Sequence, residues 1–414
     1  MDETKRKETI EQNDVEVDKA DANVQSDDLD GVAATVENQD EQPTTPPQDE
    51  NPRKKSRWFS NVFFVLSIAL SFYLMYSFAS SNELEQKKSF LEVFSNLNVK
   101  YLILSIATLI AMIGLDSLKY VVIMRATRIK AGFGTALSTS LLGKYYDNIT
   151  PFSSGGQPMQ IYYLHKKGIG GGESSAIIFI KFAFNMMMWL TICFCLMLFN
   201  RGVLITNVSD VTQRQILYVG GWIGFAFNCL LPLLILSCVV FPKMTWAITR
   251  FTLNIGYKLK IVKDKEARLE RGKNAVNNFV SAFVSMIKRP LHSIILSLLC
   301  IAEPFLSMML PFFVVVAIGG PAVTPSIELM FEIMTLNVYA QMSAMIIPTP
   351  GNSGAVESAF MLALTTLSKG VLFWTVFSWR FLSYYSYIII GTCMVVHHLI
   401  KNNRRTSVSN KVEK

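Results

Sequence analysis

Residues 141–164, "LLGKYYDNITPFSSGGQPMQIYYL", contain two prolines, two adjacent glycines and two serines inside a chain that is otherwise rich in apolar runs. Unpaired backbone groups cost several kcal/mol each in hydrocarbon, so broken backbone is tolerated at membrane depth only inside protein or beside a water-filled cavity. The stretch is amphipathic and too short to cross a bilayer twice. It predicts a re-entrant pair of half-helices with its hinge between Pro151 and Pro158.

The rest of the chain indicates a membrane protein, because 51% of its residues are apolar, only 17% are charged, and several apolar runs exceed about 18 residues. We predict an all-α polytopic membrane protein with about eight transmembrane helices, two Gly/Pro-broken or re-entrant segments and a possible inverted repeat. The apolar runs lie at 59–79, 101–124, 173–199, 215–241, 291–318, 327–347, 354–367 and 371–398. The seventh run is short for an independent span.

The distribution of Lys and Arg predicts the orientation. With eight crossings and the N-terminus inside, the cytoplasmic segments carry 26 Lys/Arg and the opposite loops carry 5. This is a strong positive-inside bias, and it requires residues 125–172 to enter and leave on the same side. We therefore expect a plasma-membrane protein with both termini in the cytoplasm.

Three charged segments flank or interrupt this predicted membrane domain, which we assign to residues 58–400. Residues 1–57 form an acidic tail with 16 Asp/Glu and 4 Lys/Arg in its first 50 residues, a composition typical of disorder, and it is not a signal peptide. Residues 242–290 form a basic cytoplasmic loop, either a helix at an anionic membrane surface or a solvated hairpin. Residues 401–414 form a basic tail. Nucleic-acid binding is disfavoured because topology alone explains the basic loop.

Cysteine and histidine give no sign of a metal site or cofactor. All six cysteines lie in apolar runs without a CxxC spacing, and the four histidines lie at segment ends. Such cysteines are typical of small buried side chains. We predict no metal, no cofactor and no catalytic residue in this chain.

A second interruption, "AMIIPTPGNSGAVESAFMLAL" at residues 344–364, shares a crude pattern with the first. In each, proline is followed by Ser-Gly and then by a polar residue, Gln157 or Glu357, that opens a helix. Paired Gly/Pro-interrupted segments in two halves of a membrane protein indicate a binding site between the halves. Half-helix N-termini at Gly155-Gly156 and Gly351–Gly354 would direct N–H groups at an anionic ligand. The alternative is a pair of ordinary turns near helix ends.

Charged residues inside the predicted spans are the third signal, because they are costly there and face a cavity or a partner. These intramembrane charges are Lys181, Glu303 and Arg380, with Glu357 at the start of the seventh run. Glu303 lies about 18 Å into its span at the helical rise, near the bilayer centre. Structural ion pairing and ligand binding explain these charges equally well at this stage.

The paired segments "LLGKYYDNITPFSSGGQPMQIYYLHKKG" and "IIPTPGNSGAVESAF" resemble the transmembrane, flippase-like domain of the lysylphosphatidylglycerol synthase family. In two-part members a membrane domain translocates aminoacylated phosphatidylglycerol and a soluble domain transfers the aminoacyl group from tRNA. Few residues follow the last apolar run, so we expect a stand-alone member without the aminoacyltransferase domain. The resemblance implies a lipid-headgroup site at Asn148, Pro151, Gly155, Gly156, Gln157, Pro158, Pro350, Gly351, Gly354 and Glu357.

The leading hypothesis is a membrane lipid translocase or lipid-binding protein for an anionic or aminoacylated phospholipid or a polyprenyl phosphate. A second hypothesis is a phosphatidylglycerol lysyltransferase-family role in lysyl-phosphatidylglycerol synthesis and cationic-peptide (antibiotic) resistance. A third is a membrane scaffold for a separate aminoacyl- or glycosyltransferase. The expected partners are thus a membrane lipid and, in the third case, that transferase.

Overall fold

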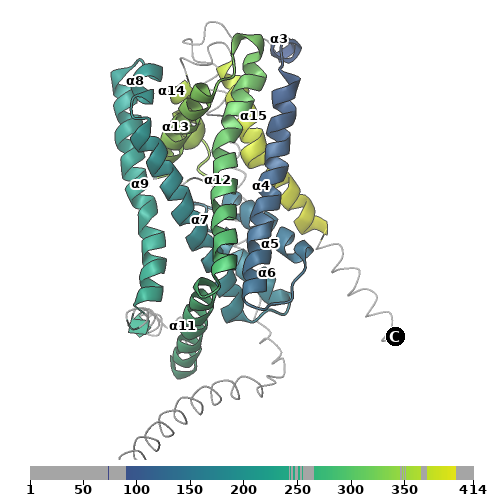
Figure 1. Cartoon of the computed structure of the whole chain (residues 1–414), viewed down its shortest axis with the longest axis vertical. Coiled ribbons are helices and arrows are strands. Elements are labelled where there is room, and N and C mark those ends of the chain that lie inside the picture. The colour runs from purple at the N-terminus through teal and green to yellow at the C-terminus, as the bar shows by residue number, and fades with distance from the viewer. Residues whose placement is uncertain are drawn as a thin grey trace, which may run out of the picture. The chain divides into compact units, whose positions relative to one another are not determined.

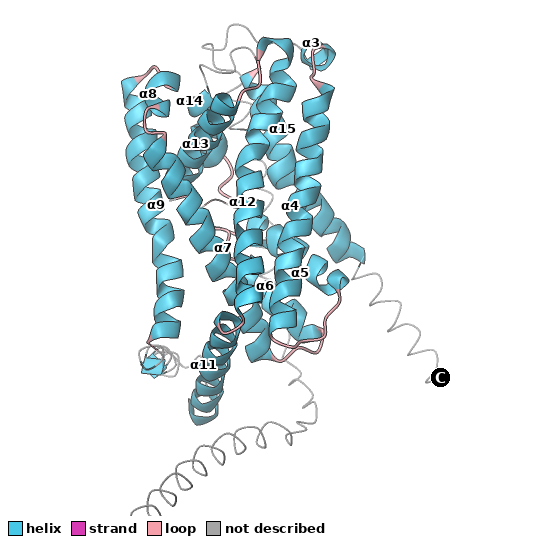
Figure 2. Cartoon of the chain, in the orientation of Figure 1, coloured by secondary structure: helices cyan, strands magenta, loops and turns pink. Residues whose placement is uncertain are grey.

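The computed structural model describes residues 90–241, 265–345, 351–364 and 371–397, with single positions at 73, 243, 246, 247, 250, 251, 254, 347 and 349. All regular structure in these residues is helical (Figure 2), which confirms the predicted fold class. Four of the predicted features lie wholly or almost wholly outside the described residues: the acidic tail 1–57, the apolar run 59–79, Pro350 and the tail 401–414.

Within the described residues, four helices are long and apolar enough to cross a membrane. They are α4 (Val99–Ala126), α7 (Gly171–Phe199), α9 (Val211–Val240) and α12 (Pro290–Gly319). Each is a continuous, mostly apolar helix of 28 to 30 residues, which at the helical rise gives about 42–45 Å. The four match the predicted runs beginning at 101, 173, 215 and 291. The total number of crossings stays a prediction.

Helix α12 lies among the others and carries much of the core (Figure 1). Its residues from Leu310 to Ile318 are all buried. Tyr101 of α4 packs edge-on against Phe312, with ring centroids 6.4 Å apart. In contrast, the outer sides of α4 and α9 expose large apolar side chains such as Ile110 and Leu230, which are 66% and 62% exposed. Lipid contact explains such faces in a membrane protein.

Shorter elements join or cover these helices. They are α3 (Phe90–Ser95), α8 (Val203–Asn207), α11 (Lys265–Ile287) and the 3₁₀ turn η1 (Gly320–Ala322). Helix α11 comes from the predicted basic loop, and its Phe283 and Met286 are buried. Phe283 packs against Phe184 of α7 with ring centroids 6.2 Å apart. This part of the basic loop is therefore a helix docked on the bundle.

Two helical hairpins lie at opposite ends of the bundle (Figure 1). The first joins α5 (Phe133–Ile149) to α6 (Gly156–Lys166) in the lower half, beside the C-terminal half of α4 and the N-terminal half of α7. The second joins α13 (Ile327–Ala344) to α14 (Ala355–Leu364) in the upper half. At 10 residues α14 rises only about 15 Å, half of the hydrocarbon thickness.

The chain then returns along one nearly continuous helical run. It comprises α15 (Leu372–Arg380), the π-helical turn η2 (Phe381–Tyr385) and helical residues 386–397. This run packs tightly on the first hairpin, since a Cβ placed on Gly391 would lie only 2.5 Å from the Cβ of Tyr145. The π-turn also contacts this hairpin, because the Tyr384 hydroxyl donates to the Asn148 carbonyl at 3.0 Å.

Candidate functional site

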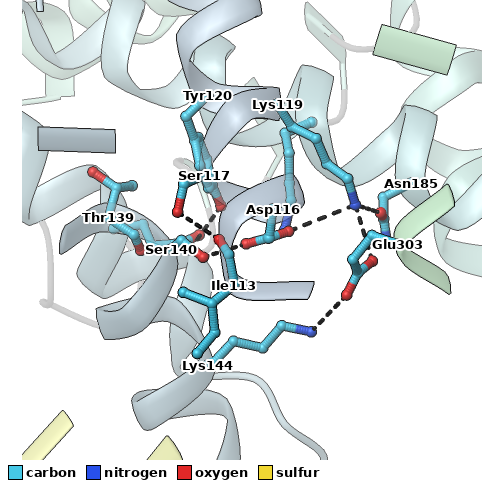
Figure 3. A network of polar contacts seen from close by, with 12 residues as sticks. Ile113, Asp116, Ser117, Lys119, Tyr120, Thr139, Ser140, Lys144, Asn185 and Glu303 are labelled. Carbon is cyan, nitrogen blue, oxygen red and sulfur yellow. Dashed lines mark hydrogen bonds and ion pairs between the residues drawn. The ribbon is translucent and has the colours of Figure 1, made fainter. Parts of the chain in front are cut away.

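A network of buried charges joins α4 and α12 at mid-depth (Figure 3). Lys119 Nζ donates to Glu303 Oε2 at 2.9 Å and also contacts Asn185 Oδ1 of α7. Glu303 is 13 residues from the first residue of α12, about 20 Å along the helix and near its middle. Lys119 is fully buried and Glu303 is 4% exposed, so both charges depend on their protein partners.

Asp116 forms the second centre of the same network. Its Oδ1 lies 2.8 Å from Lys181 Nζ on α7 and 3.6 Å from Lys119 Nζ one turn away. Its Oδ2 accepts the hydroxyl of Ser140 on α5 at 2.6 Å. The predicted intramembrane charge Lys181 is therefore neutralised by Asp116, a residue of another helix.

The first hairpin adds a more accessible cation. Lys144 Nζ of α5 lies 3.7 Å from Glu303 Oε1, and its side chain is 35% exposed, against 0% for Lys119. A long, partly exposed ion pair exchanges partners more easily than a short buried one. Lys144 is therefore the ammonium of this network best placed to meet a ligand.

A cavity of about 120 Å³ opens beside these charges, between α5, α6 and α7. Its volume holds several water molecules or a group the size of a phosphate. The lining residues are mostly polar: Asp116, Ser140, Lys144, Asp147, Gln157, Gln160, Ile178, Lys181, Phe182, Asn185 and Met186. Two residues predicted from the sequence, Gln157 and Lys181, thus lie on one cavity.

Glycines bring α5 and α6 close enough to form this cavity. A Cβ on Gly143 would lie 1.8 Å from Gln160 Nε2, which donates to the Tyr120 hydroxyl at 2.8 Å and to the Thr139 carbonyl at 3.0 Å. A Cβ on Gly156 would lie 2.3 Å from Asp147 Oδ1. Gly143 and Gly156 are therefore required because there is no space for a side chain, and not because the backbone adopts an unusual φ angle.

The N-terminus of α6 is bonded within the hairpin. Gly156 N–H donates to Asp147 Oδ1 at 2.9 Å, and Gly155 N–H donates to Thr150 Oγ1 at 2.8 Å. The two amides that we expected to face a ligand therefore already have acceptors in this structure. Burial raises the pKa of the Asp147 carboxyl to about 6, although Lys144 and the Gly156 N–H lower it.

The hairpin turn itself carries local strain. Phe152 and Ser153 have φ of 53° and 50°, a left-handed conformation that residues with side chains rarely adopt. Pro151 precedes them in the turn, and Pro158 lies in the first turn of α6, where a missing N–H leaves no helical bond unmade. The prolines thus fix the ends of the turn and stand outside the polar network.

The other two predicted charges join the second hairpin to the returning helix. Arg380 Nε donates to Glu357 Oε1 at 2.7 Å, and Gly354 N–H donates to Glu357 Oε2 at 2.7 Å. Arg380 Nη2 also donates to the Gly351 carbonyl at 3.2 Å. Gly351 and Gly354 have φ of 56° and 85°, values that favour glycine. Glu357 and Arg380 therefore fasten the turn before α14 to the returning helix.

The two hairpin turns meet at Tyr384. Its hydroxyl donates to the Asn148 carbonyl at 3.0 Å, and Asn148 Nδ2 donates to the Tyr384 carbonyl at 3.3 Å. A Cβ on Gly351 would lie 2.2 Å from Tyr384 Cε2 and 3.2 Å from the Asn148 carbonyl oxygen. The interrupted segments, about 200 residues apart in the sequence, are thus in contact. The assignment of these residues to a headgroup site stays a prediction.

Sequence reasoning did not select Lys144, Asp147, Asn185 or Tyr384 as site residues. One signal was present: Lys144 and Asp147 are three residues apart, like Asp116 and Lys119, so each pair shares a helix face.

Residues 64–391, most of the chain, match the protein-family model described as "Lysylphosphatidylglycerol synthase TM region". No curated protein and no solved structure matches the chain significantly.

Proposed function

The chain belongs to the lysylphosphatidylglycerol synthase TM region family, an integral membrane family with a flippase-like role, and on this premise we propose that it translocates a phosphate-bearing lipid. The lipid would be an anionic or aminoacylated phospholipid or a polyprenyl phosphate, since a phosphate is common to all three. We propose further that the protein acts in the plasma membrane with both termini in the cytoplasm. The positive-inside bias supports that orientation.

The observation that carries the proposal is the polar cavity beside Lys144 and Lys181. Ionisable groups at membrane depth are costly and mark ligand or ion pathways. Two ammonium groups, with amide donors from Gln157 and Asn185, supply the positive charge and hydrogen bonds that a phosphate requires. The phosphate would compete with Glu303 for Lys144, whose existing ion pair is long.

The two hairpins support a mechanism for movement between leaflets. They lie at opposite ends of the bundle and their turns touch at Asn148, Tyr384 and Gly351. Transporters built from paired broken segments expose a fixed site alternately to either side by rocking one half against the other. Separation of the first hairpin from α7 would open the cavity toward one leaflet, and the acyl chains would remain in the bilayer.

A leaflet assay tests the proposal. The full-length protein is reconstituted in phosphatidylcholine vesicles with a fluorescent phosphatidylglycerol tracer, and an impermeant quencher reports the tracer in the outer leaflet over time. We expect the protein to accelerate exchange between leaflets. Equal exchange in vesicles with and without the reconstituted protein would refute translocation.

Matched variants locate the site. Lys144→Gln removes an ammonium group from the cavity. The loss of one hydrogen bond to a charged group costs about 1.5–3 kcal/mol of binding free energy, so the affinity for the tracer should fall at least roughly tenfold. Lys130→Gln makes the same change on an exposed residue of the connector before α5 and should have no effect. Competition by inorganic phosphate distinguishes recognition of the phosphate alone from recognition of the whole lipid. Equal affinity in both variants would exclude Lys144 from the site.

A further inference from the structure

The charges around the cavity are nearly balanced. Three ammonium groups and three carboxylates form the network and the cavity wall: Lys119, Lys144, Lys181, Asp116, Glu303 and Asp147. With all six groups ionised their net charge is zero. With one carboxylate protonated it is +1.

Two of the three carboxylates are held by ammonium groups. Asp116 has Lys181 at 2.8 Å and Lys119 at 3.6 Å, and Glu303 has Lys119 at 2.9 Å and Lys144 at 3.7 Å. Protonation of Asp116 would remove the carboxylate nearest to Lys181, and protonation of Glu303 would remove the carboxylate nearest to Lys119. Loss of the counter-charge beside a buried cation is costly. These two acids therefore remain ionised.

Asp147 differs from them in its partners. Its Oδ1 accepts the backbone N–H of Gly156 at 2.9 Å, and no described ammonium group lies within 4.0 Å of its carboxylate. It lines the cavity and lies on α5, one arm of the hairpin that we predict to be re-entrant. Its pKa of about 6 places its titration close to the physiological range. Asp147 is thus the acid of this group whose charge changes most readily.

We propose that Asp147 is the proton-binding residue of a proton-coupled lipid carrier, protonated when a phosphate monoanion occupies the cavity and ionised when the cavity is empty. The inference rests on the proposed function. One proton passes from water to the Asp147 carboxylate as one anion enters, so the net charge of site and ligand is zero in both states. Movement of the loaded site then carries no net charge through the low-dielectric interior, where a net charge is costly.

Other groups around Asp147 explain a pH dependence less well. Lys144 on its own helix, Asp116 of α4 and Lys181 of α7 act on it electrostatically, and all three are in ion pairs. Beyond them Glu303 of α12 is ion-paired, and Tyr387 of the returning helix carries a phenol, a group that is ordinarily neutral across the physiological pH range. His165 is on α6 as well, but it lies nine residues beyond Gly156 at the other end of that helix.

The test measures binding of the phosphatidylglycerol tracer to the full-length protein in phosphatidylcholine nanodiscs from about pH 5.5 to about pH 8. A single linked proton predicts that affinity falls up to tenfold per pH unit above the pKa of Asp147, about fiftyfold between about pH 6 and about pH 8. Asp147→Asn keeps an acceptor for the Gly156 N–H and should bind at all pH values as the wild type does at low pH. Asp147→Ser gives a second neutral variant, with a hydroxyl in place of the carboxylate.

Two controls isolate the position. Asp210→Asn makes the same change at an acid that also accepts a backbone N–H at the start of a helix. This residue is the N-cap of α9, its carboxylate accepts the Gln213 N–H at 2.7 Å outside the cavity, and the variant should keep the wild-type pH profile. His165→Gln should also keep it. In vesicles loaded with a pH-sensitive dye, wild-type transport should move protons with the tracer, and transport by the neutral Asp147 variants should not.

The outcomes separate the two proposals. Tracer binding by the wild type that does not depend on pH, or an Asp147→Asn variant with the wild-type profile, would refute the proton coupling and leave lipid translocation standing. Loss of the pH dependence in His165→Gln would assign the proton to that histidine and also refute the role of Asp147. Absence of tracer binding and translocation by the wild type at every pH would refute both.

Discussion

The ion pair between Glu357 and Arg380 gives the sharpest test of the hairpin architecture. The side chains are 2% and 8% exposed, and Arg380 has two acceptors, Glu357 at 2.7 Å and the Gly351 carbonyl at 3.2 Å. Glu357→Gln would leave the Arg380 guanidinium buried without a counter-charge. Arg380→Gln would leave the Glu357 carboxylate buried without a counter-charge. Breaking a buried pair from one side costs about 3–5 kcal/mol.

The double variant Glu357→Gln/Arg380→Gln removes both charges, so its loss of unfolding free energy should be smaller than the sum of the two single losses. Residues in direct contact typically couple by about 0.5–3 kcal/mol, and this buried pair should lie at the upper end. Unfolding is followed by far-UV circular dichroism in mixed micelles as the fraction of dodecyl sulfate is raised. The readout is the free energy of unfolding for the wild type, both single variants and the double variant.

Glu328→Gln is the matched control, because Glu328 is an exposed acid on α13 of the same hairpin. Its effect should lie within about 0.5 kcal/mol. The reasoning fails if Glu357→Gln costs no more than this control. It also fails if the double variant loses the full sum of the single losses, because the two side chains would then act independently.

Two further substitutions test contacts of the first hairpin by the same unfolding measurement. Gly143→Ala should displace Gln160 and leave buried polar groups unpaired, which should lower the free energy of unfolding by about 1–3 kcal/mol. Gly134→Ala, in the same helix, places its methyl group in open space and should not lower the free energy of unfolding. Equal effects of the two substitutions would contradict the close packing at Gly143. Tyr384→Phe removes the hydroxyl that donates to the Asn148 carbonyl and should lower the free energy of unfolding by about 1 kcal/mol. In a variant with cysteine in place of Asn148, Tyr384→Phe should also speed the reaction of that cysteine with a thiol reagent. Unchanged reactivity would show that this contact does not hold the turns together.

The presence of the two broken segments could be predicted because their signals are local. Proline and glycine interrupt apolar periodicity, and the charge bias required residues 125–172 to start and end on one side. The structure has a hairpin at each interruption, and Gln157 and Lys181 meet at one cavity. These residues were selected for their type and depth, which a sequence displays directly.

The roles of individual residues depended on tertiary contacts. Gly155 and Gly156 suggested free N–H groups, but the acceptors from Asp147 and Thr150 come from the other arm of the hairpin. Left-handed conformations at Phe152 and Ser153 have no sequence signal, because residues with side chains seldom adopt them. Such contacts and strain become visible only when the chain is folded.

Which acid would pair with which base was equally open. Four charges, Lys181, Glu303, Glu357 and Arg380, seemed able to compensate one another in one interior. In the structure Glu357 pairs with Arg380, while Lys181 and Glu303 pair with Asp116, Lys119 and Lys144. Whether two charged side chains come within ion-pair distance depends on how each helix is rotated about its axis and on the depth of each residue in the bundle. The hydropathy of the sequence determines neither.

This division of the charges separates two tasks within one architecture. The Glu357–Arg380 pair is short, almost fully buried and bonded to backbone on both sides, so a ligand could reach it only after the second hairpin had unpacked. The Lys144–Glu303 pair is long, partly exposed and next to a polar cavity, so a phosphate can replace one partner without disturbing a helix. We therefore interpret the first pair as the fastener of a hairpin turn and the second as the exchangeable part of the site. If so, neutralising Lys144 weakens lipid affinity in a stably folded protein, whereas neutralising Glu357 acts first on stability.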